Sequence, residues 1–337
     1  MGSLSQVQLD TPSSANEPFF EISHLSVTFE TITGMLRGKK KIVRAVDDVS
    51  FELHKGEFLA IVGETGSGKS TIARCLLGLT SPSSGSIKHD GVTINNLKGK
   101  ALREYRKDVQ IVYQDPFESL INRQTVLSNI SIPFRYLNGE KNKDQIRESV
   151  ASLLNEVGLK PEIMNRYPHQ ISGGERQRVS IARALASNPK VLIADEPITM
   201  LDAAQRLNVL SLLVNLKMKR NLTLIIITHD LASAVIVGDR ILVMYAGKVL
   251  ESGPARALIS RPFHPYVELI LESTPGLDSK STMTDAVSLS SEILTASPGC
   301  VFEHRCKYAK IDCKEKQPDL VERFAEHYAA CYYPLNQ

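Results

Sequence analysis

Residues 63–70 read GETGSGKS, and their position in the chain decides the fold class. The octapeptide fits the pattern G-x-x-x-x-G-K-[ST], which is typical of a glycine-rich loop between a strand and a helix. The run EFLAIV at residues 57–62 predicts a buried strand before the loop. The run TIARCLL at residues 71–77 predicts a helix after it. This order predicts a phosphate-binding loop rather than a turn without a ligand.

The residue types in this loop suit a nucleoside triphosphate and its metal. Three glycines allow the backbone to curl so that successive N–H groups face one phosphate, and the helix N-terminus adds partial positive charge. Lys69 can reach the β- and γ-phosphates, and the Ser70 hydroxyl can bind Mg²⁺. The predicted nucleotide-binding residues here are Gly63, Glu64, Thr65, Gly66, Ser67, Gly68, Lys69, Ser70 and Thr71.

Composition limits the possible classes of protein. The chain has 337 residues, of which 42% are hydrophobic, enough for two regions with a sizeable core. Its net charge of +3 is too small to argue for a nucleic-acid partner. We find no apolar run near the ~18 residues of a membrane-spanning helix, and the polar N-terminus lacks a signal-peptide core. The chain is therefore expected in the cytosol, where five cysteines argue against a disulfide framework.

Hydrophobic periodicity predicts a strand–helix core with a helical insertion. The core is expected to be an α/β arrangement, a mixed sheet flanked by helices with antiparallel strands at its edge. The segment from about 115 to 188 is expected to be helical. Residues 1–18 are expected to be disordered, residues 31–41 to form a basic loop and residues 274–298 to form a linker. The other expected strands are 20–29, 42–53, a pair in 86–94, 110–113, 191–195, 222–228 and a hairpin in 240–250, and the other expected helices are 143–157, 203–220, 231–237 and 255–273.

Two further motifs extend the site. The apolar run VLIAD ends in Asp195, which can hold Mg²⁺ through water, and Glu196, which can orient or deprotonate an attacking water. The sequence Ser172-Gly173-Gly174 ahead of a predicted helix offers free N–H groups to an anion, or simply caps the helix.

Taken in this order, these motifs resemble the ATP-binding cassette (ABC) ATPases over about residues 20–255. The resemblance identifies a Q-loop glutamine, Gln114, which also contacts Mg²⁺, and a switch histidine, His229. The catalytic residues that it implies are Lys69, Gln114, Glu196 and His229. It makes Asp202 the D-loop aspartate.

The resemblance also implies that two cassettes face head to tail. The signature residues of one, Ser172, Gly173, Gly174 and Glu175, then contact the nucleotide of the other. An aromatic residue before the core stacks on adenine in that family, and Phe29 is the candidate here.

Within that family the chain resembles the ATPase subunits of oligopeptide/dipeptide permeases, and specifically the second of their two ATPases. The similarity lies in QIVYQDPF at residues 110–117, HPY at 264–266 and STP at 273–275. The chain departs from the common pattern of that family at residues 119–123 (SLINR), in the D-loop at Met200, and in the signature at Glu175. None of these removes a group needed for hydrolysis.

The resemblance implies an energy-coupling subunit of an importer, peripheral at the cytoplasmic face of the membrane. Its partners would be a second ATPase subunit, two transmembrane permease subunits and, indirectly, an extracellular solute-binding protein. The cargo would be a di- or oligopeptide, with nickel, glutathione or an oligosaccharide as alternatives. A non-transport ABC ATPase is the other class. The expected domains are an ATPase domain, 19–255, and a C-terminal region, 256–337.

Four cysteines gather near the C-terminus, at Cys300, Cys306, Cys313 and Cys331. Four thiols in so short a segment suggest a metal site, and both zinc and an iron–sulfur cluster accept four thiolates. Unmetallated thiols or an oxidised pair are the alternative. The resemblance implies a 4Fe–4S cluster, with zinc as second choice.

Overall fold

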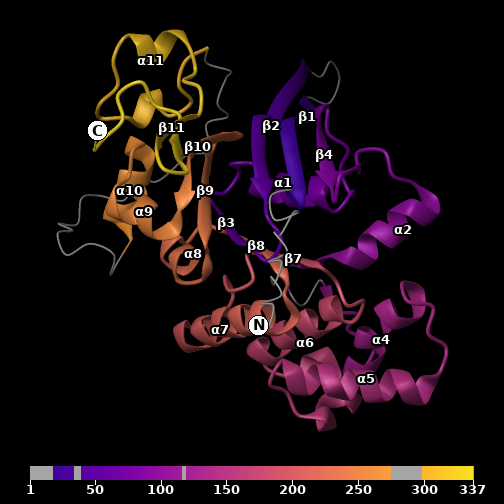
Figure 1. The fold of residues 1–337 in the computed structure, drawn as a ribbon. Coiled ribbons are helices and arrows are strands. Elements are labelled where there is room, and N and C mark those ends of the chain that lie inside the picture. Colours follow the sequence, from indigo (N-terminus) through magenta and orange to yellow (C-terminus); the bar gives the residue numbers. More distant parts are fainter. Residues whose placement is uncertain (1–17, 34–38, 116–118, 275–297, 337) are drawn as a thin grey trace, which may run out of the picture.

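The computed structural model describes residues 18–33, 39–115, 119–274 and 298–336, arranged as in Figure 1. The strands are β1 (Phe20–Thr33), β2 (Lys39–Leu53), β3 (Phe58–Val62), β4 (Ser84–His89), β5 (Val92–Thr93), β6 (Val109–Val112), β7 (Val191–Asp195), β8 (Thr223–Thr228), β9 (Arg240–Tyr245), β10 (Lys248–Pro254), β11 (Val321–Phe324) and β12 (His327–Ala329). The helices are α1 (Lys69–Leu76), α2 (Gly99–Asp108), α4 (Val126–Tyr136), α5 (Lys143–Glu156), α6 (Gly173–Leu185), α7 (Ala203–Arg220), α8 (Leu231–Val237), α9 (Ala255–Ser260), α10 (Pro265–Ser273) and α11 (Asp312–Glu315). Short 3-10 turns span Pro161–Asn165, Pro168–Gln170 and Glu303–Arg305.

The main sheet is mixed, as predicted. Its order is β11-β12-β10-β9-β3-β8-β7-β6. Strand β3 runs parallel to both β8 and β9, and β7 runs parallel to β6 and β8. Strands β10, β12 and β11 pair antiparallel at one end. The central strands are buried on both faces, which explains their continuous apolar sequences.

Alternate residues of β3 face two different hydrophobic cores. Phe58, Ala60 and Val62 belong to a core shared with the helical segment and the C-terminal residues. Leu59 and Ile61 belong to a second core shared with α1 and the antiparallel sheet. Because both cores are fully packed against one strand, the end of β3 is a fixed platform for residues 63–70.

The second sheet is antiparallel, in the order β2-β1-β4-β5, and it corrects one prediction. The expected loop at residues 31–41 is wrong at its two ends, because Thr31–Thr33 pair with Lys39–Lys41 in a continued ladder. The β-branched residues 31–33 favour a strand. The prediction of a loop rests on the basic residues that follow them. Residues 34–38 lie outside the described residues.

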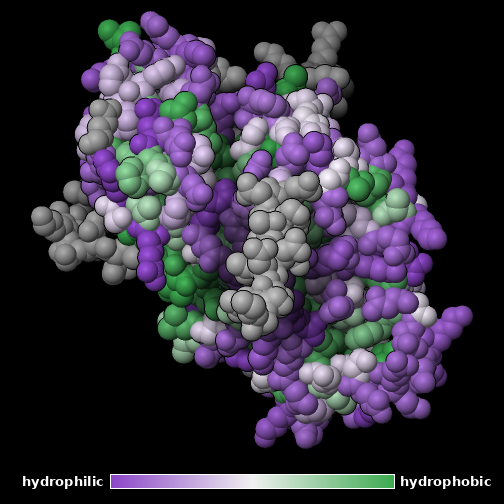
Figure 2. All heavy atoms as spheres, in the orientation of Figure 1, coloured by the Kyte–Doolittle hydropathy of each residue, from purple (hydrophilic) through white to green (hydrophobic). Residues whose placement is uncertain are grey.

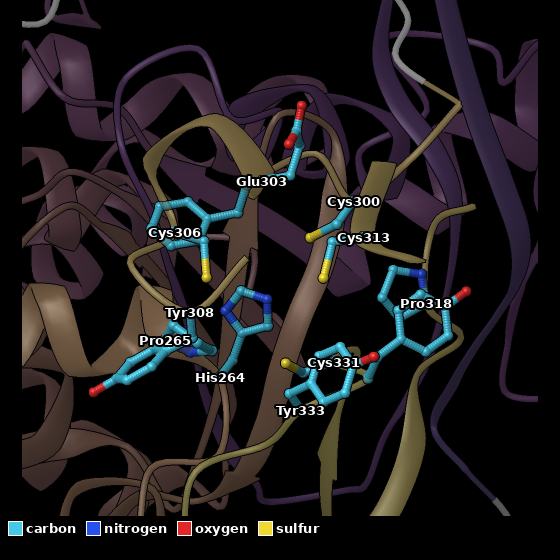
Figure 3. A pocket seen from close by; sticks show the side chains of 12 residues that line it. His264, Pro265, Cys300, Glu303, Cys306, Tyr308, Cys313, Pro318, Cys331 and Tyr333 are labelled. Atoms are coloured by element: carbon cyan, nitrogen blue, oxygen red, sulfur yellow. The ribbon is translucent and has the colours of Figure 1, made fainter. Parts of the chain in front are cut away.

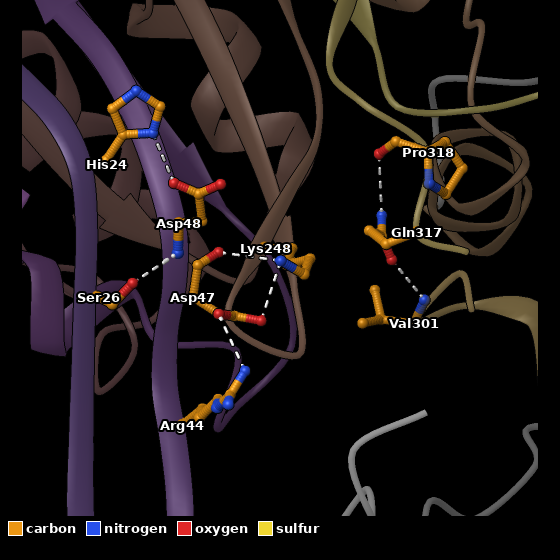
Figure 4. Close-up of polar contacts among 9 residues, drawn as sticks. All are labelled: His24, Ser26, Arg44, Asp47, Asp48, Lys248, Val301, Gln317 and Pro318. Atoms are coloured by element: carbon orange, nitrogen blue, oxygen red, sulfur yellow. Dashed lines mark hydrogen bonds and ion pairs between the residues drawn. The ribbon is translucent and has the colours of Figure 1, made fainter. Parts of the chain in front are cut away.

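The two sheets are joined beside the phosphate loop. Lys248 Nζ lies 2.9 Å from Asp47 Oδ2 and donates to the Asp47 carbonyl at 3.2 Å (Figure 4). The Asp47 N–H donates to the Gly247 carbonyl, and the Gly247 N–H donates to the Ser67 carbonyl, both at 3.0 Å. The turn between β9 and β10 therefore links β2 to the loop.

The helical segment and the C-terminal region lie at opposite sides of the main sheet (Figure 1). Helices α4, α5 and α6 form the first. The expected helix over 255–273 is two helices, α9 and α10, because residues 261–264 (RPFH) interrupt it with a proline. The predicted disorder at residues 1–18 and the predicted linker at 274–298 fall almost wholly outside the described residues.

The visible face in Figure 2 is mostly hydrophilic, with smaller hydrophobic patches over α8 and the helical segment. Exposed apolar side chains on α7 and α8 include Leu207, Met218 and Ile236. In the described parts of the chain, none of the helices combines the length and the apolar character required to cross a membrane.

Candidate nucleotide site and cysteine pocket

The loop at residues 63–70 lies where the sequence predicts it, between β3 and α1. Two of its glycines are needed because other backbone segments approach them closely. A Cβ on Gly63 would lie 2.1 Å from the Met244 carbonyl oxygen, and one on Gly68 would lie 2.1 Å from that of Ala45. Gly68 also has a φ of 102° as the N-cap of α1. The loop is thus held between β2 and β9.

Lys69 is buried, and its ammonium group is held by the loop itself. Nζ donates to the carbonyl oxygens of Gly63 and Glu64, both at 2.7 Å, and to Ser67 Oγ at 3.3 Å. Burial lowers the pKa of Lys69, while nearby carboxylates oppose this. The ammonium group thus lies within the curl of the loop, and its contact with phosphate stays a prediction.

Ser70 and Asp195 meet at the mouth of this loop. Ser70 Oγ donates to Asp195 Oδ1 at 3.1 Å. Burial raises the pKa of Asp195, and the hydrogen bond from Ser70 opposes it. A hydroxyl beside a carboxylate suits Mg²⁺, which in ATPase sites takes one or two protein groups with phosphates and water. Gln114 lies exposed beyond β6, and among the described residues no hydrogen bond joins it to either group.

Glu196 and His229 lie beside each other at the ends of β7 and β8. Glu196 adopts a left-handed φ of 45°, an uncommon conformation for this residue type. Its N–H donates to the Ile227 carbonyl at 2.8 Å. Its Oε2 accepts from Thr199 Oγ1 at 3.1 Å and lies 3.6 Å from His229 Nδ1. The carboxylate is oriented by two neighbours, as a general base needs to be.

The signature residues form the N-terminus of α6, which Figure 1 shows apart from α1. Ser172 Oγ accepts from the Glu175 N–H at 3.2 Å, and Glu175 Oε2 accepts from the Ser172 N–H at 2.8 Å. This is a capping box, so in the single chain Ser172 caps α6, as the simpler of the two sequence interpretations predicts. A Cβ on Gly174 would lie 2.6 Å from Gln205 Oε1 of α7, whereas one on Gly173 meets nothing within 4 Å.

Asp202 and Phe29 are placed on regular elements. Asp202 caps α7, accepting from the Gln205 N–H at 2.9 Å. Phe29 lies on β1 opposite Val43 and is 41% exposed. An exposed ring on a strand is available for stacking on a base. That Phe29 stacks on adenine stays a prediction.

The four cysteines border a single pocket in the C-terminal region, with sulfur atoms directed toward a common space (Figure 3). All four are free thiols; Cys300, Cys313 and Cys331 are buried and Cys306 is half-buried. Burial raises the pKa of Cys300 and of Cys331 to about 11. Among the described residues, no group of three or more His, Cys, Asp or Glu side chains is close enough to hold one metal ion.

His264 also borders this pocket, and sequence reasoning did not single it out as a functional residue. Its Nδ1 accepts from the Tyr266 N–H at 3.0 Å, so in the neutral ring Nε2 carries the proton. Nε2 is buried and has no hydrogen-bond partner among the described residues. Burial lowers the pKa of His264 to about 3. The buried N–H is therefore a donor in need of an acceptor.

Two more residues beyond 255 reach the phosphate loop, and sequence reasoning missed both contacts. Tyr266 Oη accepts from the Glu64 N–H at 3.3 Å, and Arg305 pairs with the Glu64 carboxylate at 2.9 Å. Tyr266 belongs to the HPY stretch and Arg305 lies between two of the cysteines, so the motifs mark both positions. Nothing in the sequence indicates that Glu64 is their partner.

Comparison with known proteins agrees with this geometry. The family described as "ABC transporter" matches residues 46–199, and "Oligopeptide/dipeptide transporter, C-terminal region" matches residues 250–313. The chain is 41% identical to the oligopeptide transport ATP-binding protein AppF of Bacillus subtilis (strain 168), over 94% of this chain and 97% of that protein. It is 40% identical to the glutathione import ATP-binding protein GsiA of Pectobacterium atrosepticum, over 86% of this chain and 46% of that protein.

A solved structure has the same cassette fold. The ATP-binding cassette MJ0796, a dimer bound to ADP and Pi, superposes with a TM-score of 0.63 and 30% identity, covering 70% of this chain and 99% of that one. The predicted resemblance is confirmed, and the chain belongs to the ABC transporter ATP-binding subunits of the oligopeptide/dipeptide permease family.

Proposed function

We propose that this chain hydrolyses ATP in a site completed by a second cassette, and that closure of the cassettes drives import of di- or oligopeptides. One observation carries the proposal: Ser70 with Asp195, and Glu196 with His229, lie together beside the loop at residues 63–70, in the same chain as a region matching the peptide-permease C-terminal family. The chain is an ABC-type ATPase coupled to transport.

Each residue has a proposed part in hydrolysis. Lys69 leaves its loop carbonyls to bind the β- and γ-phosphates, and Ser70 with Asp195, assisted by Gln114, would hold Mg²⁺. The ion would supply positive charge against the phosphates. Glu196 accepts a proton from the water that attacks the γ-phosphorus, so that the bond to the β–γ bridging oxygen breaks and ADP and phosphate form.

His229 is proposed to position the products of this step. Its Nδ1 lies 3.6 Å from the Glu196 carboxylate, within one side-chain adjustment of a hydrogen bond. A histidine here can contact both the base and the departing γ-phosphate. The nucleotide would lie with its adenine on Phe29, and Asp202 would lie at the cassette interface.

The signature residues support a second cassette. Gly173 is open, so a phosphate can approach the α6 N-terminus closely, where the helix dipole favours an anion. We propose that this end of α6 binds the partner's nucleotide. The division into an ATPase domain, 19–255, and a C-terminal region, 256–337, also stays a proposal, and β12 joins the two in one sheet.

The cargo is proposed from the relatives. AppF is named for oligopeptide transport, and the matching C-terminal family is named for oligopeptides and dipeptides. GsiA is named for glutathione import, which makes this tripeptide the second candidate. We propose two transmembrane permease subunits, a second ATPase and an external solute-binding protein as partners, with the chain peripheral at the cytoplasmic face of the membrane.

We also propose that the cysteine pocket holds a 4Fe–4S cluster, which four separated thiols would suit. Zinc is the second choice, because a single ion would require these side chains to draw closer together than they stand among the described residues. Cys300, Cys306, Cys313 and Cys331 supply four thiols around one shared space. The unpartnered His264 N–H supports an occupant rich in anionic acceptors, because a sulfide or thiolate would accept it. Bound, a cluster would act as a structural cross-link between the segments that carry these cysteines.

The experiment is purification of the tagged full chain from mild-detergent membranes without oxygen. Two multi-span subunits and a second cassette ATPase are the expected partners, together with about four iron and four sulfide per chain. The complex, reconstituted in vesicles, would then take up labelled dipeptide or glutathione, with Glu196→Gln as the inactive control. Recovery with ribosomes or nucleic acid and with no membrane protein would overturn the transport proposal.

A further inference from the structure

Glu64, the second residue of the phosphate loop, is held from outside the ATPase core. Arg305 Nη1 donates to both of its carboxylate oxygens, at 2.9 and 3.0 Å, across a sequence separation of 241 residues. The Glu64 N–H donates to Tyr266 Oη at 3.3 Å. The Glu64 carbonyl oxygen accepts from Lys69 Nζ at 2.7 Å. One loop residue thus contacts the ammonium group expected to bind phosphate and two residues of the C-terminal region.

Arg305 is anchored on a cluster of aromatic rings. Its guanidinium carbon lies 5.6 Å from the centroid of Tyr245 and 5.7 Å from that of Phe302. The ring of Tyr266 lies 4.9 Å from that of Tyr245 and 5.2 Å from that of Phe302. Cation–π contacts and packed rings restrict the rotamers of Arg305 before it reaches Glu64. The pair is therefore pre-organised rather than a mobile surface contact.

The same segment connects this cluster to the cysteine pocket. Phe302 borders the pocket, and Arg305 ends a 3-10 turn that lies between Cys300 and Cys306. The Glu303 N–H donates to the Cys300 carbonyl at 3.0 Å, and the Cys306 N–H donates to the Glu303 carbonyl at 3.2 Å. A group bound to both thiols would fix the two ends of the turn that presents Arg305.

We propose that Arg305 is a positioning residue for the phosphate loop, and that occupancy of the cysteine pocket sets nucleotide affinity through the Arg305–Glu64 pair. The inference rests on the proposed nucleotide site. Arg305 and Glu64 are 29% and 32% exposed, so solvent screens the pair partly. Its loss is expected to weaken nucleotide binding about three- to tenfold, through an increase in KM with little change in kcat.

The test measures the Kd of a fluorescent ATP analogue with Mg²⁺ for the full chain. Arg305→Gln removes the pair, and Arg305→Lys keeps the charge. Lys307→Gln is the matched control, because it removes one positive charge from the same segment, where Lys307 pairs with Glu268 at 3.1 Å and not with the loop. Glu64→Gln probes the pair from the other side. In the double variant of Arg305→Gln and Glu64→Gln the two effects should not add.

A second arm compares wild-type chain reconstituted with iron and sulfide against the same chain without them. The reconstituted chain should bind the analogue more tightly, and Arg305→Gln should abolish the difference. Equal Kd values for Arg305→Gln and Lys307→Gln would overturn the positioning role. Equal Kd values for the two wild-type forms would overturn the link to the pocket. A wild-type chain that binds no nucleotide in either form would instead refute the proposed function.

Discussion

Substituting alanine at two glycines of the phosphate loop separates backbone conformation from close approach. Gly66 and Gly68 both have left-handed φ values, 84° and 102°. An L-residue in this region costs about 1–2 kcal/mol, and this cost is common to Gly66→Ala and Gly68→Ala. Any further difference between the variants must come from what each new methyl group meets.

The surroundings of the two positions differ sharply. A Cβ at position 66 has no heavy atom within 4 Å, whereas one at 68 would lie 2.1 Å from the Ala45 carbonyl oxygen. That oxygen is backbone of β2, and Asp47, two residues on, is tied to the β9–β10 turn. Relief therefore requires a strand to shift, which costs a further ~1–3 kcal/mol. We expect Gly68→Ala to lose about 2–5 kcal/mol in all and Gly66→Ala about 1–2 kcal/mol.

Urea unfolding of the nucleotide-free chain measures both values, provided that the dependence on denaturant concentration is unchanged between variants. Equilibrium binding of an ATP analogue gives a second measure, and Gly68→Ala should lose the greater part of its affinity. The reasoning is refuted if the two variants unfold with the same free energy, or if Gly68→Ala remains within about 0.5 kcal/mol of the wild type.

Three further predictions concern other buried or reactive groups. His327→Ala removes the Nε2 that lies 2.7 Å from the fully buried Glu251, and should cost about 3–5 kcal/mol of unfolding free energy; the exposed His304→Ala is the control. Burial lowers the pKa of His89, so the unfolded chain binds more protons, and the free energy of unfolding should fall as pH drops below about 6.5, by up to about 1.4 kcal/mol per pH unit. His89→Phe should flatten this pH dependence in urea titrations, and an unchanged slope would show that His89 is not its source. Glu196→Gln should retain ATP binding and lose at least about 100-fold in phosphate release; undiminished release would place the base elsewhere.

Elements with strong local signals were predictable from the sequence. Helix α7 spans Ala203–Arg220 as predicted, because its apolar residues recur at helical spacing and Asp202 caps it. The phosphate loop follows from glycines, a lysine and a preceding apolar strand. In each case the determining interactions lie within a few residues of one another.

The missed elements depend on partners far along the chain. Strand β12 has only three residues, and its position is fixed by pairing with β10, at Glu251 and Ser252. Residues 31–33 of β1 pair with residues 39–41 of β2, at the two ends of the expected basic loop. Short strands of this kind carry little periodic signal, so their registers emerge only from the assembled sheet.

The site shows the same division. The sequence predicted parts for Lys69, Asp195 and Glu196 in one nucleotide site, because the order of their motifs along the chain is itself a signal, and those parts stay predictions. It did not show that Lys69 rests on the Glu64 carbonyl, or that Arg305 holds the Glu64 carboxylate. Those contacts depend on where the C-terminal region packs, and no local pattern encodes that position.

The β9–β10 turn gives the C-terminal region a further connection to the phosphate loop, besides the contacts of Arg305 and Tyr266 with Glu64. The Gly247 N–H donates to the Ser67 carbonyl at 3.0 Å, while the next strand, β10, pairs with β12 and carries Glu251. Glu251 accepts from the backbone N–H of His264 at 2.6 Å and pairs with His327. By these contacts, a shift of the C-terminal region would act on the loop both through Arg305 and through a strand of the main sheet. Because the sheet connection survives loss of Arg305, removing that side chain should tune nucleotide affinity rather than abolish it.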